Sequence, residues 1–481
     1  MPVLPDMDAP FSFRRPPLGA WLLFGLLFVV ALLLVPPVGA ADGDLDLTFS
    51  GDGKATVLWD EVGDSYAQAS QVVVLPDGST VVGGDLTWTS NGFHSDWVFA
   101  KLSRSGILDS TWGESGRQRV AFDLVEGATD LLLGLFPEPD GAVLAVGTAS
   151  NGSHRLPAMA RFLPNGDADP AFGDSGLLYL ATGPWTSSQL TFVTAKRAAN
   201  GRIVLAGYCK NCPSNDSDYN LFALRLLANG SPDTSFSTDG WASWGSPDAG
   251  NDVLTALGLE PNGRIVLGIK RNGAPQLARV FSGGQFDSSF GEGGWAVPTF
   301  LGNESRIEDL VVENDRRGVV AAFWGDFGSG VTPFGGLMRF DSAGEQDSAF
   351  GSGPFALFDL EEGVKLFALS RQGDGKLLVA GSINANGAQR EEFLVARTGA
   401  DGDLDVTFDG NGLARYSIDR TTNGEDVAFA IALEGGRPVV AGYAFDALHE
   451  ADFALIRLQN DYVFCDGFEG GNTGEWTDSA N

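Results

Sequence analysis

Residues 222–236 read FALRLLANGSPDTSF, and the closing phrase of this stretch recurs in seven versions along the chain. The stretch begins as an apolar strand that ends in Arg225, and it continues to Asp233, three residues before the aromatic Phe236. The recurrent aspartates are Asp46, Asp109, Asp169, Asp233, Asp287, Asp347 and Asp405. Their spacings of 63, 60, 64, 54, 60 and 58 residues give a period close to 60, which indicates a repeat architecture.

A basic residue ends the apolar strand of every repeat, and in the first six repeats it stands eight residues before the next recurrent aspartate. These bases are Lys101, Arg161, Arg225, Arg279, Arg339, Arg397 and Arg457. Because a guanidinium group suits planar contacts with a carboxylate, we predict that base and aspartate pair within the scaffold. We also expect the aspartate to cap a tight turn and the aromatic residue to lie in the core.

A second phrase combines turn residues with an apolar strand at the same phase of the repeat. Asn200-Gly201 precedes 203–207 (IVLAG), and Asp374-Gly375 precedes 377–381 (LLVAG). Turn residues of this type beside β-branched or apolar runs are typical of β-hairpins. Each repeat therefore reads as four strands, one after the aromatic residue, two around the hairpin turn and one that ends in the base.

Four strands per repeat and the lack of an amphipathic helix pattern predict an all-β fold, a seven-bladed β-propeller built from seven four-stranded repeats of about 60 residues. An open solenoid would need atypical polar repeats at its ends. Here the first repeat, from Asp46, and the last, to Arg457, keep the common pattern. The sequence therefore favours a closed ring.

The three phrases together resemble the delta-60 repeat family of bacterial secreted β-propeller-like proteins. The resemblance rests on a strand like F-A-L-A-R, a turn like L-D-x-x-F-G-x-x-G and a hairpin like P-D-G-K, and it covers about residues 43–458. It weakens in the fifth repeat, where Arg317-Gly318 replaces the turn phrase. The resemblance implies an architecture and offers no catalytic residues to carry over.

The first 40 residues have the pattern of a secretory signal. Arg14 and Arg15 precede an apolar run over 18–35, and small residues follow at 38–40. We predict a signal peptide over 1–40, cleaved after Ala40; an uncleaved membrane anchor is the alternative. The mature protein is then expected to be secreted, periplasmic or on the cell surface, with no membrane insertion after cleavage.

The predicted propeller spans 41–460 and is followed by a tail, 461–481, outside the repeat. The tail looks like the short D-G-F-E-x-G…W terminus of assorted secreted proteins of gram-negative bacteria. Sorting or attachment is one interpretation. Packing of Phe468 and Trp476 against the ring is the other.

The chain is strongly acidic, with 62 Asp and Glu against 31 Lys and Arg and a formal charge of −31. Such a charge repels phosphate backbones and anionic lipid, so we expect no nucleic-acid partner. Cations, proteins and neutral glycans remain open as ligands. A monomer is expected.

Cys209 and Cys212 form a C-x-x-C pair, and Cys465 stands alone near the end. A zinc site lacks further ligands nearby, and a thioredoxin-type motif lacks its βαβ context. A local disulfide between Cys209 and Cys212 is the prediction.

The stretch Asp401-Gly402-Asp403-Leu404-Asp405 resembles a calcium loop, which makes Asp401, Asp403 and Asp405 weak metal candidates. It lacks the glycine at position six and the closing glutamate. The alternative is an acidic surface that keeps the protein soluble. No other cofactor is expected, and His94, His154 and His449 occupy unrelated positions, which argues against a catalytic triad.

The third repeat differs from the others, with no acidic residue between Gly176 and Asn200 but with Lys196 and Arg197. It is either a partner-binding edge or an ordinary diverged repeat. Three tryptophans, at positions that follow a first strand, either stack sugars or pack between blades; they are Trp241, Trp244 and Trp295.

These observations favour an exported, non-enzymatic β-propeller scaffold that binds a protein or glycan partner outside the cytoplasm. The alternative is an extracellular polysaccharide hydrolase or lyase with carboxylates in the central mouth of the propeller. An enzyme would need non-repeated polar residues that converge at one end of the axis, whereas a scaffold does not.

Overall fold

A computed structural model of the chain describes residues 41–59, 65–88, 94–125, 127–180, 183–184, 189–212, 218–245, 250–299, 305–313, 318–325, 333–358, 363–384, 391–418, 424–445 and 450–460. All of them belong to the unit Ala41–Asn481. The predicted signal peptide, the C-terminal tail and Cys465 lie outside the described residues. The described part of the chain contains no helix with the length and apolarity that a membrane span requires.

Five consecutive stretches of the chain each form a separate antiparallel four-stranded sheet, which is one propeller blade. Their strands are β6 (Leu131–Pro137), β7 (Val143–Ser150), β8 (Arg155–Phe162) and β9 (Leu177–Tyr179); β10 (Gln189–Arg197), β11 (Ile203–Lys210), β12 (Tyr219–Leu226) and β13 (Trp241–Trp244); β14 (Asp252–Leu259), β15 (Ile265–Arg271), β16 (Ala274–Val280) and β17 (Trp295–Ala296); β18 (Ser305–Glu313), β19 (Gly318–Gly325), β20 (Phe334–Phe340) and β21 (Ala356–Phe358); β22 (Val364–Arg371), β23 (Leu377–Asn384), β24 (Glu391–Thr398) and β25 (Leu413–Tyr416).

The first and last repeats share one eight-stranded sheet. Its strands are β26 (Asp426–Glu434), β27 (Arg437–Phe445), β28 (Ala451–Arg457), β2 (Ser65–Val74), β3 (Thr80–Trp88), β4 (His94–Leu102), β5 (Arg117–Val120) and β1 (Lys54–Val57). Strand β1 pairs with β28, from the other end of the described chain, and a single parallel bridge joins Tyr66 of β2 to Ala451 of β28.

The structure is therefore an all-β propeller with four-stranded blades, but the prediction of a seven-bladed propeller is wrong. It has five separate blades and one eight-stranded sheet. The physical reason is the closure of the ring, where the N-terminal β1 completes the sheet of the last repeat and the bridge between Tyr66 and Ala451 fuses that sheet to the first repeat.

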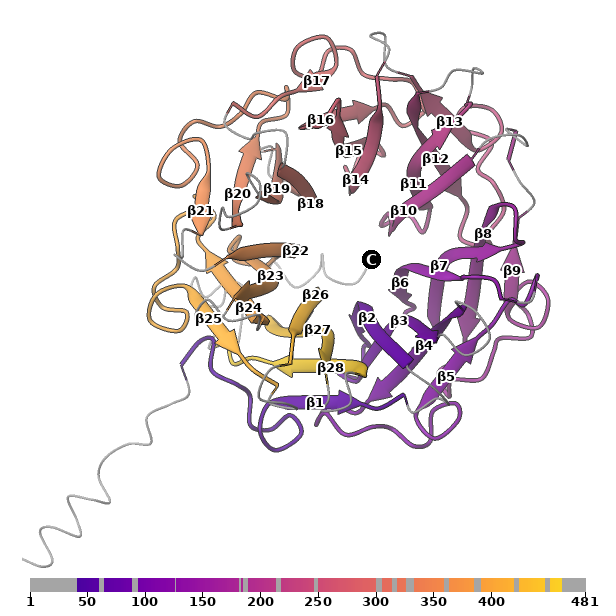
Figure 1. The fold of residues 1–481 in the computed structure, drawn as a ribbon, viewed down its shortest axis with the longest axis vertical. Helices are drawn as coiled ribbons and strands as arrows, with labels where there is room; N and C mark the ends of the chain where they lie inside the picture. The colour runs from indigo at the N-terminus through magenta and orange to yellow at the C-terminus, as the bar shows by residue number, and fades with distance from the viewer. Residues whose placement is uncertain are drawn as a thin grey trace, which may run out of the picture. The chain divides into compact units, whose positions relative to one another are not determined.

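The first strand of each repeat lies innermost, and neighbouring first strands contact one another around the axis (Figure 1). In order these strands are β2, β6, β10, β14, β18, β22 and β26, and β26 contacts β2 again. Each carries a β-bulge at the same place in its register with the second strand. The residues that the register skips are Ser70, Leu133, Val193, Thr255, Glu308, Phe367 and Phe429.

The bulge explains a recurrent glycine of the hairpin phrase. A Cβ on Gly207 would lie 1.9 Å from the Thr191 carbonyl oxygen, and a Cβ on Gly381 would lie 1.9 Å from that of Lys365. Both glycines face the residue just before the bulge on the first strand. The backbones approach so closely at these positions that only glycine fits.

The hairpin turns between first and second strands and the turns that carry the recurrent aspartates lie at the same end of the ring, because Arg202 of a hairpin turn contacts Asp233 of an aspartate turn. We name this end the turn face. First strands begin and second strands end at the other face.

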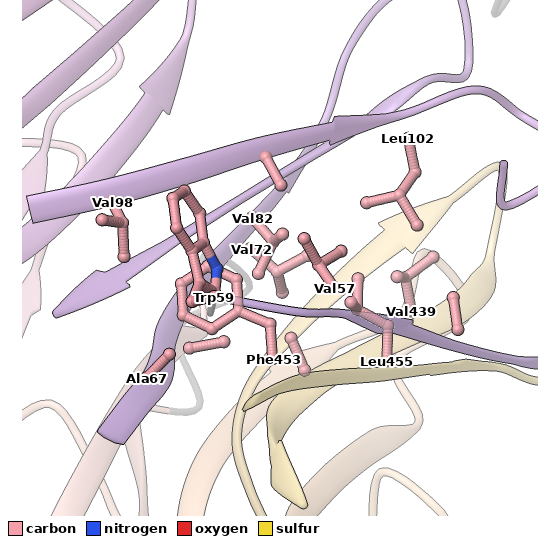
Figure 2. Close-up of a cluster of buried hydrophobic side chains, with 14 of the residues drawn as sticks. Val57, Trp59, Ala67, Val72, Val82, Val98, Leu102, Val439, Phe453 and Leu455 are labelled. Carbon is pink, nitrogen blue, oxygen red and sulfur yellow. The ribbon is translucent and has the colours of Figure 1, made fainter. Parts of the chain in front are cut away.

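A buried cluster packs where the two ends of the described chain meet (Figure 2). Trp59, which follows β1, contacts Phe453 of β28, with ring centroids 5.7 Å apart. The backbone ladder continues beside it, because the amide of Arg457 donates to the Gly53 carbonyl at 3.0 Å. The ring is thus closed by a strand pairing and by a core that draws on both ends.

We predict that Ala55→Pro destabilises the protein and that Thr56→Pro does so much less. Hydrogen-bonded pairs alternate along an antiparallel ladder, so the bonded pair Gly53–Arg457 implies that Ala55 bonds Leu455 and that Thr56 points its amide away from β28. Losing a ladder bond to a buried acceptor costs about 2 kcal/mol. Thermal and urea unfolding of both variants tests this; equal losses would contradict closure through β1.

Candidate functional site

The recurrent bases and aspartates meet in pairs on the turn face. Arg225 Nε lies 2.8 Å from Asp233 Oδ2, and the other pairs repeat this contact. They are Arg279–Asp287 at 2.8 Å, Arg339–Asp347 at 2.5 Å, Arg397–Asp405 at 2.8 Å, Lys101–Asp109 at 3.4 Å, and Arg161–Asp169. The last base, Arg457, pairs with the first aspartate, Asp46, at 2.8 Å.

The aspartate and the base each make further contacts inside the scaffold. Asp233 Oδ1 accepts hydrogen bonds from the amide and the hydroxyl of Ser235, at 3.0 and 2.6 Å, so it caps the turn. The Arg225 guanidinium lies over Phe236, with 4.7 Å from Cζ to the ring centroid, and its Nη1 donates to the Ser282 carbonyl at 2.5 Å. Ser282 belongs to the next repeat, so this one side chain joins two repeats.

A second base reaches the same carboxylate from the hairpin turn in three repeats. Arg202 lies 2.7 Å from Asp233, Lys376 lies 2.8 Å from Asp405, and Arg437 lies 3.2 Å from Asp46. The sequence analysis missed these residues, although each one directly follows the hairpin glycine. Burial alone would raise the pKa of Asp233, but hydrogen bonds from Ser235 and the charge of Arg225 lower it to about 2.

The calcium candidates belong to this turn face. Asp405 Oδ2 already contacts both Arg397 and Lys376, and Asp401 Oδ1 accepts the amide of Asp403 at 3.3 Å. Within the described ranges, no group of three or more His, Cys, Asp and Glu side chains is arranged to hold a metal ion. The arrangement of Asp401, Asp403 and Asp405 is that of a turn stabilised by its own amides and by two cations.

The third repeat contains a disulfide between Cys209 and Cys212 at the end of β11. Both cysteines are buried, and Asn220 Nδ2 donates to the Cys212 carbonyl at 2.7 Å. Arg197 pairs with Glu138 at 2.6 Å, in the preceding repeat. The disulfide thus pins the start of the segment between β11 and β12.

The three tryptophans Trp241, Trp244 and Trp295 have less than a tenth of their surface exposed. Trp244 Nε1 donates to the Gly284 carbonyl at 2.9 Å, and the Arg271 guanidinium lies over Trp295 at 4.1 Å. These rings pack within the scaffold, which is the second of the two interpretations offered by the sequence.

Side chains at the other face differ from repeat to repeat. The bulge marks an equivalent position in every second strand, opposite the bulge. One residue further along the second strand, towards this face, tyrosine occurs in two repeats and every other repeat has a different residue. These residues are Asp85, Thr148, Tyr208, Lys270, Trp324, Ser382 and Tyr443. We name this face the variable face.

Charged side chains of the inner strands form a non-repeated network around the bulge of β18. Glu308, at the bulge of β18, accepts a hydrogen bond from Trp324 Nε1 at 2.8 Å and pairs with Arg306 at 2.5 Å. Burial raises the pKa of Glu308 to about 7. Its neighbour Asp309 binds Lys196 of β10 at 2.7 Å, although β14 lies between β10 and β18 in the ring. This contact therefore crosses the inside of the ring.

A hollow of about 280 Å³ opens between the first and second repeats. Its polar and aromatic lining is Trp88, His94, Asp96, Arg119, Asp123 and Asp130. His94 stacks on Trp88 with centroids 5.1 Å apart, and Arg119 lies over the same ring at 4.5 Å while it pairs with Asp96 at 2.7 Å. Burial raises the pKa values of Asp96 and Asp130.

Comparison with family models finds a match in three segments. The model described as a domain of unknown function (DUF5122) beta-propeller matches residues 138–172, 198–236 and 372–408. Each segment runs from a hairpin turn to a recurrent aromatic residue. The chain is a β-propeller repeat protein. No curated protein matches its sequence.

Comparison with solved structures finds matches at low identity and with TM-scores below 0.5. A catalytically inactive virginiamycin B lyase from Staphylococcus aureus, solved with quinupristin, matches at 12% identity with a TM-score of 0.43, over 83% of this chain and 97% of that one. The polysaccharide lyase Uly1 matches at 10% and 0.45, over 82% and 90%. Trypanosoma rangeli sialidase with the inhibitor DANA matches at 10% and 0.41, over 84% and 58%. Likenesses this distant do not support a function.

We predict that Arg225→Ala and Asp233→Ala are strongly non-additive. Asp233→Ala leaves the buried Arg225 without its carboxylate and is expected to cost about 3–5 kcal/mol. Arg225→Ala is expected to cost less, because Arg202 still contacts Asp233, and the double variant should cost little more than Asp233→Ala alone. Urea unfolding of the two single variants and the double variant measures the coupling. Arg202→Ala is the control, because its side chain is 40% exposed and a smaller loss is expected. Additive losses would show that the pair does not act as a unit.

We predict that the melting temperature falls as the pH rises from about 5 to about 8. Asp85 Oδ1 accepts the Leu132 amide at 2.8 Å, and burial raises the pKa of Asp85 to about 7. Because this folded-state value lies above the unfolded one, the folded protein keeps a proton that the unfolded chain has released, and stability is lost as the pH rises through the folded pKa.

The test is Asp85→Asn, which keeps an acceptor for the Leu132 amide and removes the titrating group. The variant should show a flatter pH dependence and a higher melting temperature than the wild type at about pH 8. Asp77→Asn in the hairpin turn of the same repeat is the control. The pKa of Asp77 is lowered, so its carboxyl group does not titrate in this window. An unchanged slope in Asp85→Asn would refute the assignment.

Proposed function

We propose that the chain is an exported, non-enzymatic β-propeller scaffold of the delta-60 repeat kind that binds a protein or glycan partner through its variable face. The observation that carries the proposal is the difference between the two faces. On the turn face, the recurrent Arg, Asp and aromatic side chains contact one another and the next repeat. On the variable face, the aligned positions carry different side chains. Recognition tends to reside where a rigid scaffold is free to vary.

Export is supported by the signal-like pattern of 1–40 and by the Cys209–Cys212 disulfide, since disulfides persist in oxidising compartments. The proposed protein acts as a monomer in the periplasm, at the cell surface or outside the cell. It needs no cofactor, and its charge of −31 directs it away from nucleic acid and anionic lipid.

The second candidate function is polysaccharide cleavage, and Glu308 is the observation in its favour. A carboxyl group whose pKa is raised to about 7 suits a general acid, and Asp309 stands beside it. However, Glu308 is engaged by Arg306 and Trp324, and Asp309 is engaged by Lys196 and by the Leu369 amide at 3.0 Å. Carboxylates held in this way act more readily as structural and binding groups, so the scaffold function is preferred.

The test compares two surface variants of the exported protein. Arg306→Ala with Lys365→Ala alters the variable face, whereas Ile107→Ser with Leu227→Ser alters exposed apolar side chains in turns of the turn face. Binding to purified extracellular polysaccharides and surface proteins of the source cell is measured by biolayer interferometry. We expect a loss of about tenfold for the variable-face variant, equivalent to about 1.4 kcal/mol, and unchanged binding for the turn-face variant.

Equal loss in both variants would refute binding through the variable face. Release of new reducing ends from a polysaccharide by the wild type, abolished by Glu308→Gln, would establish the enzymatic candidate in place of the scaffold.

A further inference from the structure

Six aromatic side chains from β19, β22, β26, β27 and β2 form a continuous row of ring contacts towards the variable face, and the last three, Tyr443, Tyr66 and Phe445, all contact one another. Phe367 and Phe429 occupy the bulges of the adjacent inner strands β22 and β26, with ring centroids 4.8 Å apart. Trp324 of β19 extends the row on one side, 6.5 Å from Phe367. On the other side the successive contacts are Phe429–Tyr443 at 5.8 Å, Tyr443–Tyr66 at 5.3 Å and Tyr66–Phe445 at 5.6 Å.

The row is confined to one part of the ring. The bulge residues of the second, third and fourth repeats are Leu133, Val193 and Thr255, none of which is aromatic. A side chain needed by every blade would recur in every blade, as the turn-face aspartates do. The aromatic row is therefore not required by the propeller fold itself.

The rings of the row keep part of their surface uncovered. Tyr66, Trp324, Phe367, Phe429 and Phe445 are half-buried, and only Tyr443 is buried. Four of the rings, Tyr66, Phe367, Phe429 and Phe445, pack on a small buried cluster of Val427, Tyr443 and Ala451, which covers only part of their surface. Half-covered rings on the inner strands form an apolar surface that a ligand can cover.

The charges around the row balance in pairs. Arg306 pairs with Glu308 at 2.5 Å, Lys365 pairs with Glu391 at 2.5 Å, and Lys196 pairs with Asp309 at 2.7 Å. A surface of matched charges has no surplus cation to hold a polyanion, and the acidic protein as a whole repels one. The same groups, with the Tyr66 and Tyr443 hydroxyls and the Trp324 indole, supply donors and acceptors beside the rings.

A protein partner fits this surface less well. An exposed apolar patch is a common mark of a protein-binding site, and the large apolar side chains that are exposed among the described residues lie outside the row. They are Leu47, Leu58, Ile107, Val125, Tyr179, Leu227, Val297 and Val406. A pyranose presents an apolar ring face and a rim of hydroxyl groups, and a row of rings with polar neighbours matches several such units in succession.

We infer that the aromatic row, Trp324–Phe367–Phe429–Tyr443–Tyr66–Phe445, is a binding track for a chain of neutral sugars. This inference rests on the proposed function and specifies its ligand class. Ring faces stack on successive sugars, and the paired charged groups at the edge of the track bond their hydroxyls.

The experiment uses affinity gel electrophoresis with hydroxyethyl cellulose, dextran and galactomannan as neutral probes and alginate as the anionic probe. The test variant is Phe367→Leu with Phe429→Leu, which keeps apolar bulk and removes two stacking faces. The matched control is Tyr208→Leu, the same kind of change at the position of Trp324 and Tyr443 but in the third repeat. Phe367→Tyr with Phe429→Tyr keeps the rings and serves as the rescue.

We expect at least one neutral probe to retard the wild type, with affinity about tenfold weaker in the leucine variant and close to wild type in the control and in the rescue. The thermal melting of each variant establishes that the ring is intact. Retardation by alginate alone, or an equal loss in Tyr208→Leu, would overturn the inference.

The outcomes also separate this inference from the proposed function. If no neutral probe binds but a purified surface protein does, with loss in the variant Arg306→Ala with Lys365→Ala, then the neutral-glycan track is wrong and the scaffold function stands. If neither class of partner binds the variable face, both are wrong.

Discussion

The fold depends on a guanidinium group that is held from two sides. In each of five repeats an arginine lies over its own aromatic residue, at 4.6 to 4.9 Å, and pairs with its own aspartate. Its second nitrogen donates to the next repeat, as Arg279 does to Ser342 at 2.6 Å and Arg339 to Ala400 at 2.8 Å. Backbone bonds run beside these contacts, such as Gly291 to Ala343 at 2.6 Å. A blade cannot bury both faces alone, and this contact sets its angle to the next.

Because of this contact, the two faces of the propeller differ in how readily their side chains can be substituted. On the turn face the loss of Asp233 leaves the buried Arg225 without a carboxylate, and the loss of Arg225 leaves Asp233 with only the more exposed Arg202, so substitution there is costly. On the variable face no single side chain recurs at the aligned positions, and the strand accommodates a lysine, a tryptophan and a serine at Lys270, Trp324 and Ser382. The scaffold thus constrains the side chains of the turn face, whereas those of the variable face can differ and serve binding.

Contacts within one repeat can be predicted from the sequence because they recur at a fixed spacing. Contacts made by ring closure, and the burial of individual side chains, cannot. The spacing of eight residues between Arg225 and Asp233 places both groups at one turn, whereas the pair between Arg457 and Asp46 depends on ring closure across 411 residues. The predicted number of blades is also wrong because of ring closure, since the single bridge between Tyr66 and Ala451 joins the sheets of the first and last repeats. Phe367 and Phe429 read as ordinary strand residues, because a bulge has no sequence signature except the glycine opposite it, such as Gly381 or Gly442.

The pKa values of the acidic side chains also differ between the two faces of the propeller. On the turn face the pKa of Asp233 is lowered to about 2, because hydrogen bonds and arginine charges outweigh its burial. Towards the variable face burial dominates and raises the pKa values of Asp85 and Glu308 to about 7. Burial therefore shifts Asp85 and Glu308 towards their neutral forms at a pH at which Asp233 is ionised. Glu308 remains paired with Arg306 and bonded to the Trp324 indole, so this edge of the aromatic row offers the hydroxyl groups of a neutral ligand donors and acceptors without a surplus charge.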